Sequence, residues 1–312
     1  MPETSPLRLG TRGSMLAKVQ SGQVADELEK CHPGLHVELC IIKTTGDQIV
    51  DLPLSEAGGK GLFVKELERA LLDGQVEFAV HSFKDVPVTM PLVEQENLIV
   101  AAVPQREDAR DLLISDKAKS LADLPQGALV GTGSLRRRSQ LLAVRPDLRV
   151  EGIRGNIDTR LRKCQEGQFD AIILAMAGIK RAGLYDSAIM TPIDPAEMLP
   201  AAGQGALSLQ CRADDQRTRE LLGVLHDPAT AACVQAEREV VRLLDGDCFS
   251  PIAAYARIVE DRMELRVAIG RRGGELPLLR ASAAGPASEP LRIAAKAHQQ
   301  LSEQGVQTHL HG

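Results

Sequence analysis

Short apolar runs alternate with amphipathic stretches through the first half of the chain, a pattern typical of a mostly parallel sheet flanked by helices. The apolar runs predict strands at residues 7–9, 37–42, 78–80 and 98–103. Between them, apolar residues recur at helical spacing, which predicts helices at residues 14–30 and 62–72. We therefore expect an α/β unit assembled from β-α-β crossovers.

A second unit with the same alternation follows. Its predicted strands are residues 128–130, 149–152 and 171–174, and its predicted helices are residues 134–144 and 157–166. Prolines at positions 192, 195 and 200 then mark a linker. A further strand at residues 206–210 comes after this linker, and we expect it to return to the first unit.

The last hundred residues have a different pattern. A helix is predicted at residues 230–244, followed by alternating segments at 252–258 and 263–269 that predict an antiparallel hairpin. A third strand is expected near residues 276–280, and a final helix at about 287–304. We expect the remaining tail to be frayed, with its two histidines in solvent. This pattern indicates a small α+β domain.

Composition narrows the class of protein. The 312 residues are 44% hydrophobic, enough for a sizeable core, and the length suggests about two or three domains. No apolar run approaches a membrane span, and the N-terminus lacks a signal-peptide pattern, so we expect a cytoplasmic protein. The six cysteines are scattered without CxxC spacing. We therefore expect no disulfide framework and no metal site.

Charge is unevenly distributed along the chain. The net charge is −5, yet the segment from Arg136 to Lys163 holds nine basic and three acidic residues. A local basic cluster in an acidic protein favours a specific anionic ligand. Nucleic acid is the competing interpretation, but single-strand binding usually relies on aromatic stacking, and aromatic residues make up only 2% of this chain.

The cluster contains candidate anion-binding residues. Arg136 and Arg137 fall in the first turn of the helix that opens with Gly131-Thr-Gly-Ser134. Positive side chains oppose the helix dipole there, and a bound carboxylate or phosphate would explain them. The alternative is a solvated helix face. Arg154-Gly-Asn156 and Arg160 occupy the next strand-to-helix junction, where α/β sheets bind ligands.

Three further residues are candidates for chemistry. Asp85 follows a buried strand beside Lys84, so it can act as a general acid/base or as counter-charge to a cation; pairing with Lys84 or capping a turn is equally compatible. His81 has no second histidine at ligand spacing, which favours a hydrogen-bonded core histidine. Cys248 lies in a Gly/Asp turn, where a cysteine can be a nucleophile or an inert small side chain.

Several motifs resemble those of the porphobilinogen deaminase (hydroxymethylbilane synthase) family, in order and over nearly the whole chain. They are Thr11-Arg-Gly-Ser-Met-Leu-Ala17, Thr44-Thr-Gly-Asp47, Gly59-Lys-Gly-Leu-Phe-Val-Lys-Glu-Leu67, His81-Ser-Phe-Lys-Asp-Val-Pro87, Gly131-Thr-Gly-Ser-Leu-Arg-Arg137, Arg154-Gly-Asn156, Thr159-Arg160, Ala177-Gly-Ile-Lys-Arg181 and Gly203-Gln-Gly205. Two departures from the family pattern are Gly133, where a serine is usual, and the cysteine turn, in which Asp247 and Phe249 flank Cys248.

The resemblance implies two periplasmic-binding-protein-like α/β domains plus a small C-terminal α+β domain. It places domain 1 at residues 1–103 and 201–220, domain 2 at 104–200 and domain 3 at 221–312. It further implies an enzyme that joins four porphobilinogen molecules on a dipyrromethane cofactor and releases hydroxymethylbilane, acting as a monomer without nucleic acid, membrane or metal. A non-catalytic two-domain carboxylate-binding protein is the alternative from another class.

The resemblance also implies roles for individual residues. Asp85 matches the catalytic aspartate, Cys248 matches the cysteine that holds the dipyrromethane through a thioether, and Phe63 matches an aromatic residue that shapes the site. Other positions match residues that bind cofactor and substrate: Arg12, Ser14, Lys60, Ser82, Lys84, Thr132, Ser134, Arg136, Arg137, Arg154, Gly155, Arg160, Arg181 and Gln204.

Overall fold

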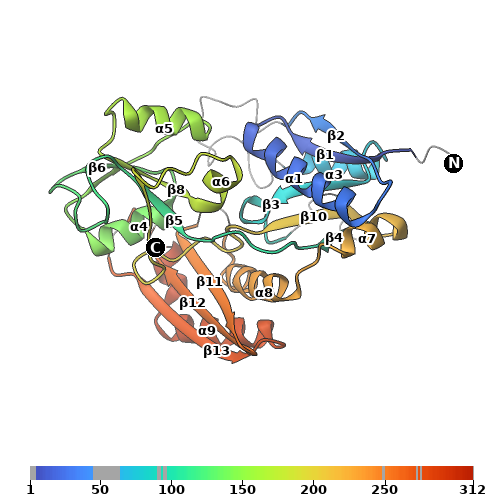
Figure 1. Ribbon diagram of the computed structural model, residues 1–312. Helices are drawn as coiled ribbons and strands as arrows, with labels where there is room; N and C mark the ends of the chain where they lie inside the picture. The colour runs from blue at the N-terminus through green and yellow to red at the C-terminus, as the bar shows by residue number, and fades with distance from the viewer. Residues whose placement is uncertain are drawn as a thin grey trace. The chain divides into compact units, whose positions relative to one another are not determined.

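The computed structural model describes residues 5–44, 64–89, 93, 97–247, 250–271, 273–274 and 276–311. The chain divides into two compact units (Figure 1). Unit 1 consists of Met1–Arg106 and Ala206–Ala231, and unit 2 of Glu107–Gly205 and Ala232–Gly312. No helix within the described ranges combines the length and apolar character that a membrane span requires.

Unit 1 contains a five-stranded sheet with the strand order β2-β1-β3-β10-β4. In that order the strands are Val37–Ile42, Leu7–Arg12, Phe78–Ser82, Leu207–Arg212 and Leu98–Ala102. β1 is parallel to β2 and β3, whereas β10 is antiparallel to β3 and β4. The predicted return of the chain after the proline-rich linker is therefore confirmed.

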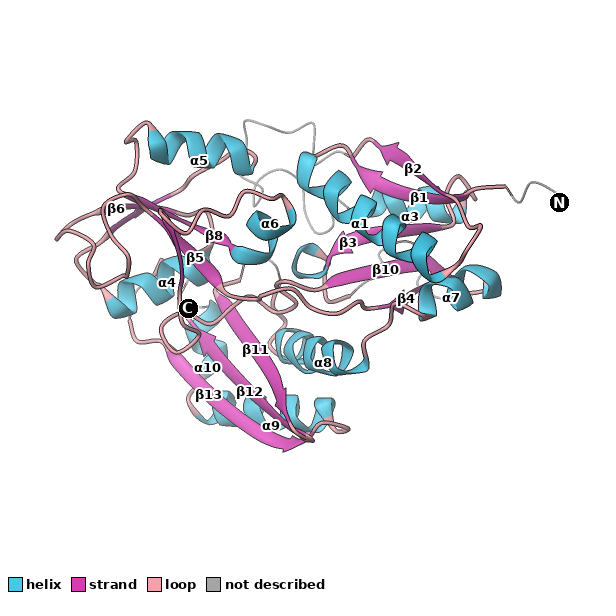
Figure 2. Ribbon diagram, viewed as in Figure 1, coloured by secondary structure: helices cyan, strands magenta, loops and turns pink. Residues whose placement is uncertain are grey.

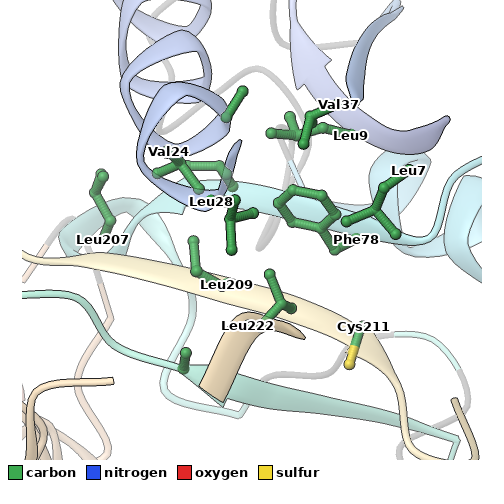
Figure 3. Close-up of a cluster of buried hydrophobic side chains, with 13 residues drawn as sticks. Leu7, Leu9, Val24, Leu28, Val37, Phe78, Leu207, Leu209, Cys211 and Leu222 are labelled. Atoms are coloured by element: carbon green, nitrogen blue, oxygen red, sulfur yellow. The ribbon is translucent and has the colours of Figure 1, made fainter. Parts of the chain in front are cut away.

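The core of unit 1 forms where the apolar face of a strand meets the apolar face of a helix. Leu7 and Leu9 point to one face of β1, as alternate strand residues do, and Val24 and Leu28 lie one turn apart on α1. Figure 3 shows these side chains gathered with Phe78. The helices of unit 1 are α1 (Met15–Cys31), α3 (Lys65–Leu72) and α7 (Gln216–Gly223), with the 3₁₀ helix η1 (Phe83–Asp85) after β3.

Unit 2 begins with a second sheet of the same plan, in the order β7-β6-β8-β5-β9. Its strands are Arg149–Glu151, Leu129–Gly131, Ala171–Ala175, Asp111–Ile114 and Met190–Pro192. β6 is parallel to β7 and β8, and β5 is antiparallel to β8 and β9. The helices are α4 (Leu135–Val144), α5 (Ile157–Gln165) and α6 (Met176–Arg181). The sequence pattern did not predict β5 or β9.

The rest of unit 2 is an antiparallel sheet with helices, as expected. Its strands are β11 (Ile252–Val259), β12 (Arg262–Ile269) and β13 (Leu279–Pro286), seen side by side in Figure 2. The helices are α8 (Pro228–Leu243, which begins in unit 1), α9 (Pro290–Glu303) and α10 (Val306–His311). Two expectations were wrong. The third strand runs well beyond residue 280, and the tail forms α10 with His309 buried rather than frayed.

The expected fold class is confirmed: two α/β sheets of the same strand order and a small C-terminal α+β part. The exact boundaries of three domains stay a prediction.

Candidate functional site

Polar residues gather at the carboxyl ends of β1 and β3 in unit 1. These strands are parallel with Leu9 opposite Phe78, so Arg12 and Ser82 end at the same sheet edge. Ser14 is the N-cap of α1, and its Oγ accepts a hydrogen bond from the backbone N–H of Ala17 at 3.3 Å. Arg12 and Ser14 are thus placed where a parallel sheet commonly receives its ligand.

Asp85 is presented to solvent by the short helix η1. The helix begins at Phe83, whose ring is buried and whose backbone N–H donates to the carbonyl of Ala206 at 3.0 Å. Just before it, the hydroxyl of Ser82 donates to Oε1 of Gln20 at 3.1 Å. With this anchor, Lys84 is half-buried and Asp85 is exposed. An exposed carboxylate on a fixed backbone is available to a substrate.

His81 lies below this edge in a buried polar chain. Its Nε2 is 3.0 Å from Oε1 of Gln210, and Nε2 of Gln210 donates to Oε1 of Glu68 at 3.0 Å. Burial lowers the pKa of His81 to about 4, with the Gln210 hydrogen bond opposing the shift and the charge of Arg12 adding to it. The imidazole is therefore neutral at pH 7. The interpretation of His81 as a hydrogen-bonded core residue is confirmed.

The start of α4 in unit 2 is capped in the same way as the start of α1. Ser134 is the N-cap, and its Oγ accepts from the N–H of Arg137 at 3.4 Å. Oγ1 of Thr132 accepts from the N–H of Ser134 at 3.3 Å. A Cβ at Gly131 would lie 3.0 Å from side-chain atoms of both Ile172 and Phe169, so a larger residue there would force these side chains to shift. Two similar helix starts therefore follow β1 and β6, which hold the same place in the orders of their sheets.

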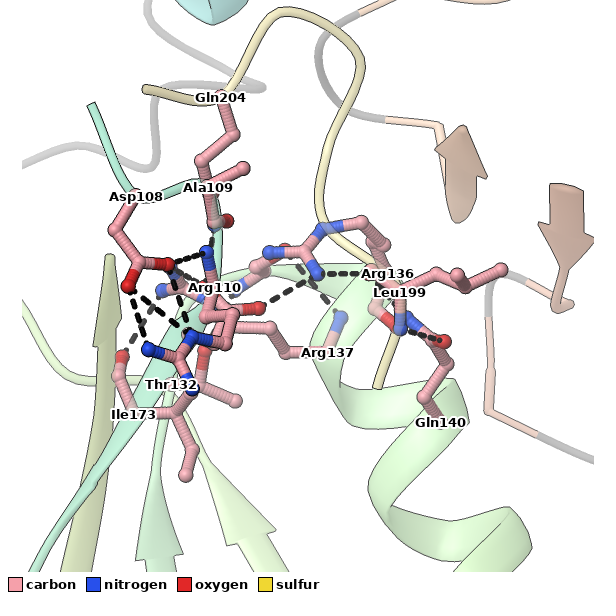
Figure 4. A network of polar contacts seen from close by, with 12 residues as sticks. Asp108, Ala109, Arg110, Thr132, Arg136, Arg137, Gln140, Ile173, Leu199 and Gln204 are labelled. Carbon is pink, nitrogen blue, oxygen red and sulfur yellow. Dashed lines mark hydrogen bonds and ion pairs between the residues drawn. The ribbon is translucent and has the colours of Figure 1, made fainter. Parts of the chain in front are cut away.

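Arg136 and Arg137 are buried, and both bind Asp111. Nη1 of Arg136 donates to Oδ2 of Asp111 at 2.8 Å, and Nη2 of Arg137 donates to Oδ1 at 2.8 Å. Nε2 of Gln204 donates to the same Oδ1 at 2.9 Å. The arginines also donate to the carbonyls of Leu199 and Ile173, at 2.6 and 2.9 Å (Figure 4). This network joins α4 to β5, β8 and the segment that precedes β10.

The basic residues in the first turn of α4 are explained by the carboxylate of Asp111, which binds them from within the protein. Neither the anionic ligand nor the solvated face considered from the sequence accounts for the observed contacts. Burial alone would raise the pKa of Asp111, but the charges and hydrogen bonds of Arg136 and Arg137 hold that pKa well below its usual range. Two guanidinium groups against one carboxylate leave a net charge of +1. A ligand role for these arginines stays a prediction.

Arg154 and Gly155 lie in the turn between β7 and α5, and Arg160 lies in the first turn of α5. Nε of Arg160 donates to the carbonyl of Gly155 at 2.7 Å. Gly155 has φ of +108°, and a Cβ there would lie 2.6 Å from Cγ2 of Thr159, so only glycine fits. Arg154 is exposed and Arg160 is half-buried. The turn thus displays guanidinium groups at the carboxyl end of a parallel strand.

Arg181 lies at the end of α6 and is held by the chain segment that leads into β10. Its Nη2 donates to the carbonyl of Gly205 at 2.8 Å. Burial lowers the pKa of Arg181, and the charge of Glu107 opposes that shift. Gly205 has φ of +88°, and a Cβ there would lie 2.4 Å from the carbonyl oxygen of Glu107. Both glycines of Gly203-Gln-Gly205 have positive φ, which fixes Gln204 between them.

Lys60, Phe63 and Cys248 lie outside the described residues, as does the glycine-rich loop at residues 58–61. The described part of the cysteine turn is tight. Ser250 Oγ accepts from the N–H of Asp247 at 3.0 Å and donates to Oδ1 of Asp247 at 2.9 Å. At Gly246 a Cβ would lie 2.5 Å from Cδ1 of Ile252. Asp247 is therefore held by Ser250, and a side chain at position 246 would have to displace the end of Ile252.

Comparison with known proteins identifies the class. Residues 7–220 match the family description "Porphobilinogen deaminase, dipyromethane cofactor binding domain", and residues 231–303 match "Porphobilinogen deaminase, C-terminal domain". The chain belongs to the porphobilinogen deaminase family.

The similarity extends to individual relatives. The chain is 49% identical over 300 residues to a porphobilinogen deaminase from Syntrophobacter fumaroxidans, covering 96% of this chain and 95% of that protein. It is 50% identical over 260 residues to one from Geobacter sulfurreducens, covering 83% and 80%. Among solved structures, a nutrient binding protein from Burkholderia cenocepacia bound to methionine matches 69% of this chain and 89% of that chain, with 16% identity and a TM-score of 0.41.

The described residues fit a cofactor that carries carboxylates. In unit 2, Arg154 is exposed, Arg160 and Arg181 are half-buried, and the Asp111 network keeps a net positive charge. Guanidinium groups bind carboxylates through two parallel hydrogen bonds, and a helix N-terminus adds favourable partial charge. These residues can bind anionic side groups. Asp85 in unit 1 can stabilise a positive charge that develops during a reaction.

Proposed function

We propose that the protein is a porphobilinogen deaminase, also called hydroxymethylbilane synthase. It joins four porphobilinogen molecules head to tail, with loss of one ammonia from each, and one water molecule completes the linear tetrapyrrole hydroxymethylbilane. The observation that supports this proposal most strongly is that the chain matches both domains of the porphobilinogen deaminase family. The candidate aspartate, arginines and cysteine at the matching positions support it.

We assign Cys248 as the residue that holds a dipyrromethane through a thioether at its Sγ. When bound, this cofactor supplies the pyrrole end to which the first substrate is joined. The assignment is supported by the match of residues 7–220 to a dipyrromethane-binding domain and by the tight turn at Gly246 and Asp247. Cys211 and Cys233 are buried in the core and are poor candidates for attachment.

Asp85 is the proposed catalytic residue. Ammonia leaves porphobilinogen when the bond between the aminomethyl carbon and the protonated nitrogen breaks, and the electron pair departs with nitrogen. The carbon that remains is cationic and is stabilised by the carboxylate oxygens of Asp85. When that carbon bonds to the next pyrrole, one proton is lost, and the same carboxylate can accept it. The exposed position of Asp85 on the anchored helix η1 supports both roles.

Basic, hydroxyl and amide side chains, together with the backbone at Gly155, bind the acetate and propionate groups of substrate and cofactor. We assign this role to Arg12, Ser14, Lys60, Ser82, Lys84, Thr132, Ser134, Arg136, Arg137, Arg154, Gly155, Arg160, Arg181 and Gln204, with Phe63 shaping the site. Each porphobilinogen adds two negative charges, so several cationic groups are required. We further propose that the protein has three domains and acts in the cytoplasm as a monomer, without nucleic acid or membrane.

The stoichiometry of the reaction tests this proposal. Purified protein is incubated with porphobilinogen, and released ammonia and linear tetrapyrrole are both measured. We expect four ammonia molecules for each tetrapyrrole. A non-catalytic carboxylate-binding protein would bind porphobilinogen without releasing ammonia, and that result would overturn the proposal.

A further inference from the structure

A cavity of about 310 Å³ lies in unit 2, between the antiparallel sheet and the segment that precedes β10. It is lined by Arg266 and Val267 of β12, by Arg280, Ala281 and Ser282 of β13, and by Gln300 of α9. Pro195, Ala196 and Leu199 also line it. None of these residues belongs to the set assigned above to substrate and cofactor.

The strand register places the polar residues on one face of the sheet. Arg266 is opposite Ser282, and Ala268 is opposite Arg280, so Arg266 and Arg280 are diagonal neighbours on that face. The alternate residues, including Val267 and Ala281, are buried, and α9 packs against β12 and β13. Ala268 instead packs with Leu199. The two arginines therefore share the face that Leu199 partly covers.

The outward backbone groups of Ser282, on the edge strand β13, are bound by the side chain of Gln300. Oε1 of Gln300 accepts from the N–H of Ser282 at 3.1 Å, and its Nε2 donates to the Ser282 carbonyl at 3.0 Å. Arg266 and Ser282 are therefore a non-hydrogen-bonded pair, the type whose side chains approach most closely. Ser282 and Arg266 are thus placed opposite each other, and both line the cavity.

The charge of the arginines is not balanced by an acid in the part of the chain that the structure describes. No ion pair of Arg266 or Arg280 occurs among those residues; Arg266 is half-buried, and Arg280 and Ser282 are exposed. Glu264, on the same face, is held by Arg257 at 2.7 Å, and Asp194 accepts from the N–H of Ala196 at 2.7 Å. Glu197, next to the lining segment, is exposed. The cavity wall is therefore rich in donors and positively charged.

The opposite wall is held in place. The Leu199 carbonyl accepts from Arg136 at 2.6 Å and from Nε2 of Gln140 at 3.0 Å, and the Leu199 N–H donates to Oε1 of Gln140 at 2.8 Å. Figure 4 shows these three residues in contact. A cavity with one fixed wall is preorganised, which reduces the entropy lost on binding.

We propose that this cavity binds a small organic acid or phosphate ester that carries two or more negative charges. Arg266 and Arg280 supply charge-assisted hydrogen bonds, and the Ser282 hydroxyl supplies one more donor. The cavity volume is at the lower end of the range for small-molecule sites, which limits the ligand to a compact anion.

Titration with citrate and with inorganic phosphate, each at low ionic strength, tests this site. Binding is measured by calorimetry on the wild type, the double variant Arg266→Gln/Arg280→Gln and the control Arg262→Gln. Arg262 lies on the same strand and face but four residues away, outside the cavity lining. We expect the double variant to lose about tenfold or more in affinity, because two charge-assisted contacts are removed. Arg262→Gln should bind like the wild type.

Urea unfolding of each variant without ligand verifies that the fold is intact. Tighter binding of citrate than phosphate indicates a carboxylate ligand, and the reverse order indicates a phosphate ester; either supports the site. Equal binding by the wild type and the double variant assigns the anion to other residues and overturns the proposal. Absence of binding of both probes to the wild type at millimolar concentration also overturns it.

Discussion

Nη1 of Arg136 lies 2.8 Å from Oδ2 of Asp111, and both side chains are buried. The carboxylate that anchors the first turn of α4 therefore comes from β5, a strand twenty-five residues earlier in the chain. Removing it leaves two buried guanidinium groups without their acid. We expect Asp111→Asn to destabilise the fold by about 3–5 kcal/mol, the usual cost of breaking a buried ion pair.

Urea unfolding at pH 7 measures this loss. The matched control is Asp147→Asn, which breaks a surface pair with Arg145 and should cost little. Since the pKa of Asp111 is lowered by folding, its contribution is complete above the ordinary pKa of an aspartate and is lost as the pH falls through the lower folded value. Equal stability of the two variants would contradict the structural role of Asp111.

His81 should make stability depend on pH in a separate window. Folding lowers its pKa from 6.5 to about 4, so the stabilisation is complete above pH 6.5 and is lost as the pH falls toward 4. The shift corresponds to about 3 kcal/mol. Unfolding free energies measured across this range should fall for the wild type and change much less for His81→Gln. The exposed His36 provides the control, and His36→Gln should keep the wild-type profile.

Gly155 should tolerate no side chain. Alanine at φ of +108° is strained, and its Cβ would overlap Thr159. We expect Gly155→Ala to cost about 1–3 kcal/mol and to lower kcat/KM, because the turn that carries Arg154, and whose Gly155 carbonyl binds Arg160, must move. Gly152→Ala is the control, since a Cβ there meets nothing within 4 Å. If both variants resemble the wild type in kcat/KM, the turn has no part in binding substrate.

Asp85→Asn should separate catalysis from folding. The amide keeps the size of the side chain but removes the charge that faces the cationic carbon, so we expect turnover to fall by about 10²–10³. Asp73, another exposed carboxylate of unit 1, provides the control, and Asp73→Asn should retain activity. Unfolding of Asp85→Asn in urea should match the wild type. Turnover near the wild-type rate in this variant would remove Asp85 from the mechanism.

The sequence predicted the regular parts of the fold because periodicity is a local signal. Helix α5 was expected at residues 157–166 and is observed at Ile157–Gln165, and the strand expected at 206–210 is β10. β5 and β9 were missed although β6 and β7, which are equally short, were expected, so length alone does not explain the miss. β9 ends at Pro192, which the sequence pattern assigned to a linker, and β5 opens with the charged Asp111; both strands are held by antiparallel pairing with distant strands. Their existence depends on tertiary contacts.

The candidate site was predicted unevenly for the same reason. Motifs located Ser14, Ser134 and Asp85 at helix starts or strand ends, as observed. Asp111 was missed: it opens a short apolar run, and nothing local shows that Arg136 and Arg137 bind it. The sequence shows charge and spacing, but it does not show which opposite charge a buried arginine meets. That pairing arises only when β5 and α4 come together.

The mass of the intact, active protein tests the central claim most directly. The sequence accounts for 33.6 kDa, and a thioether at Cys248 predicts an excess that equals two linked pyrrole units. The excess should survive denaturation and map to the peptide that contains Cys248. Cys248→Ser should lose both excess and activity, whereas Cys31→Ser, which removes an exposed cysteine, should keep both. Active protein with only its sequence mass, or an adduct on another cysteine, would contradict the account.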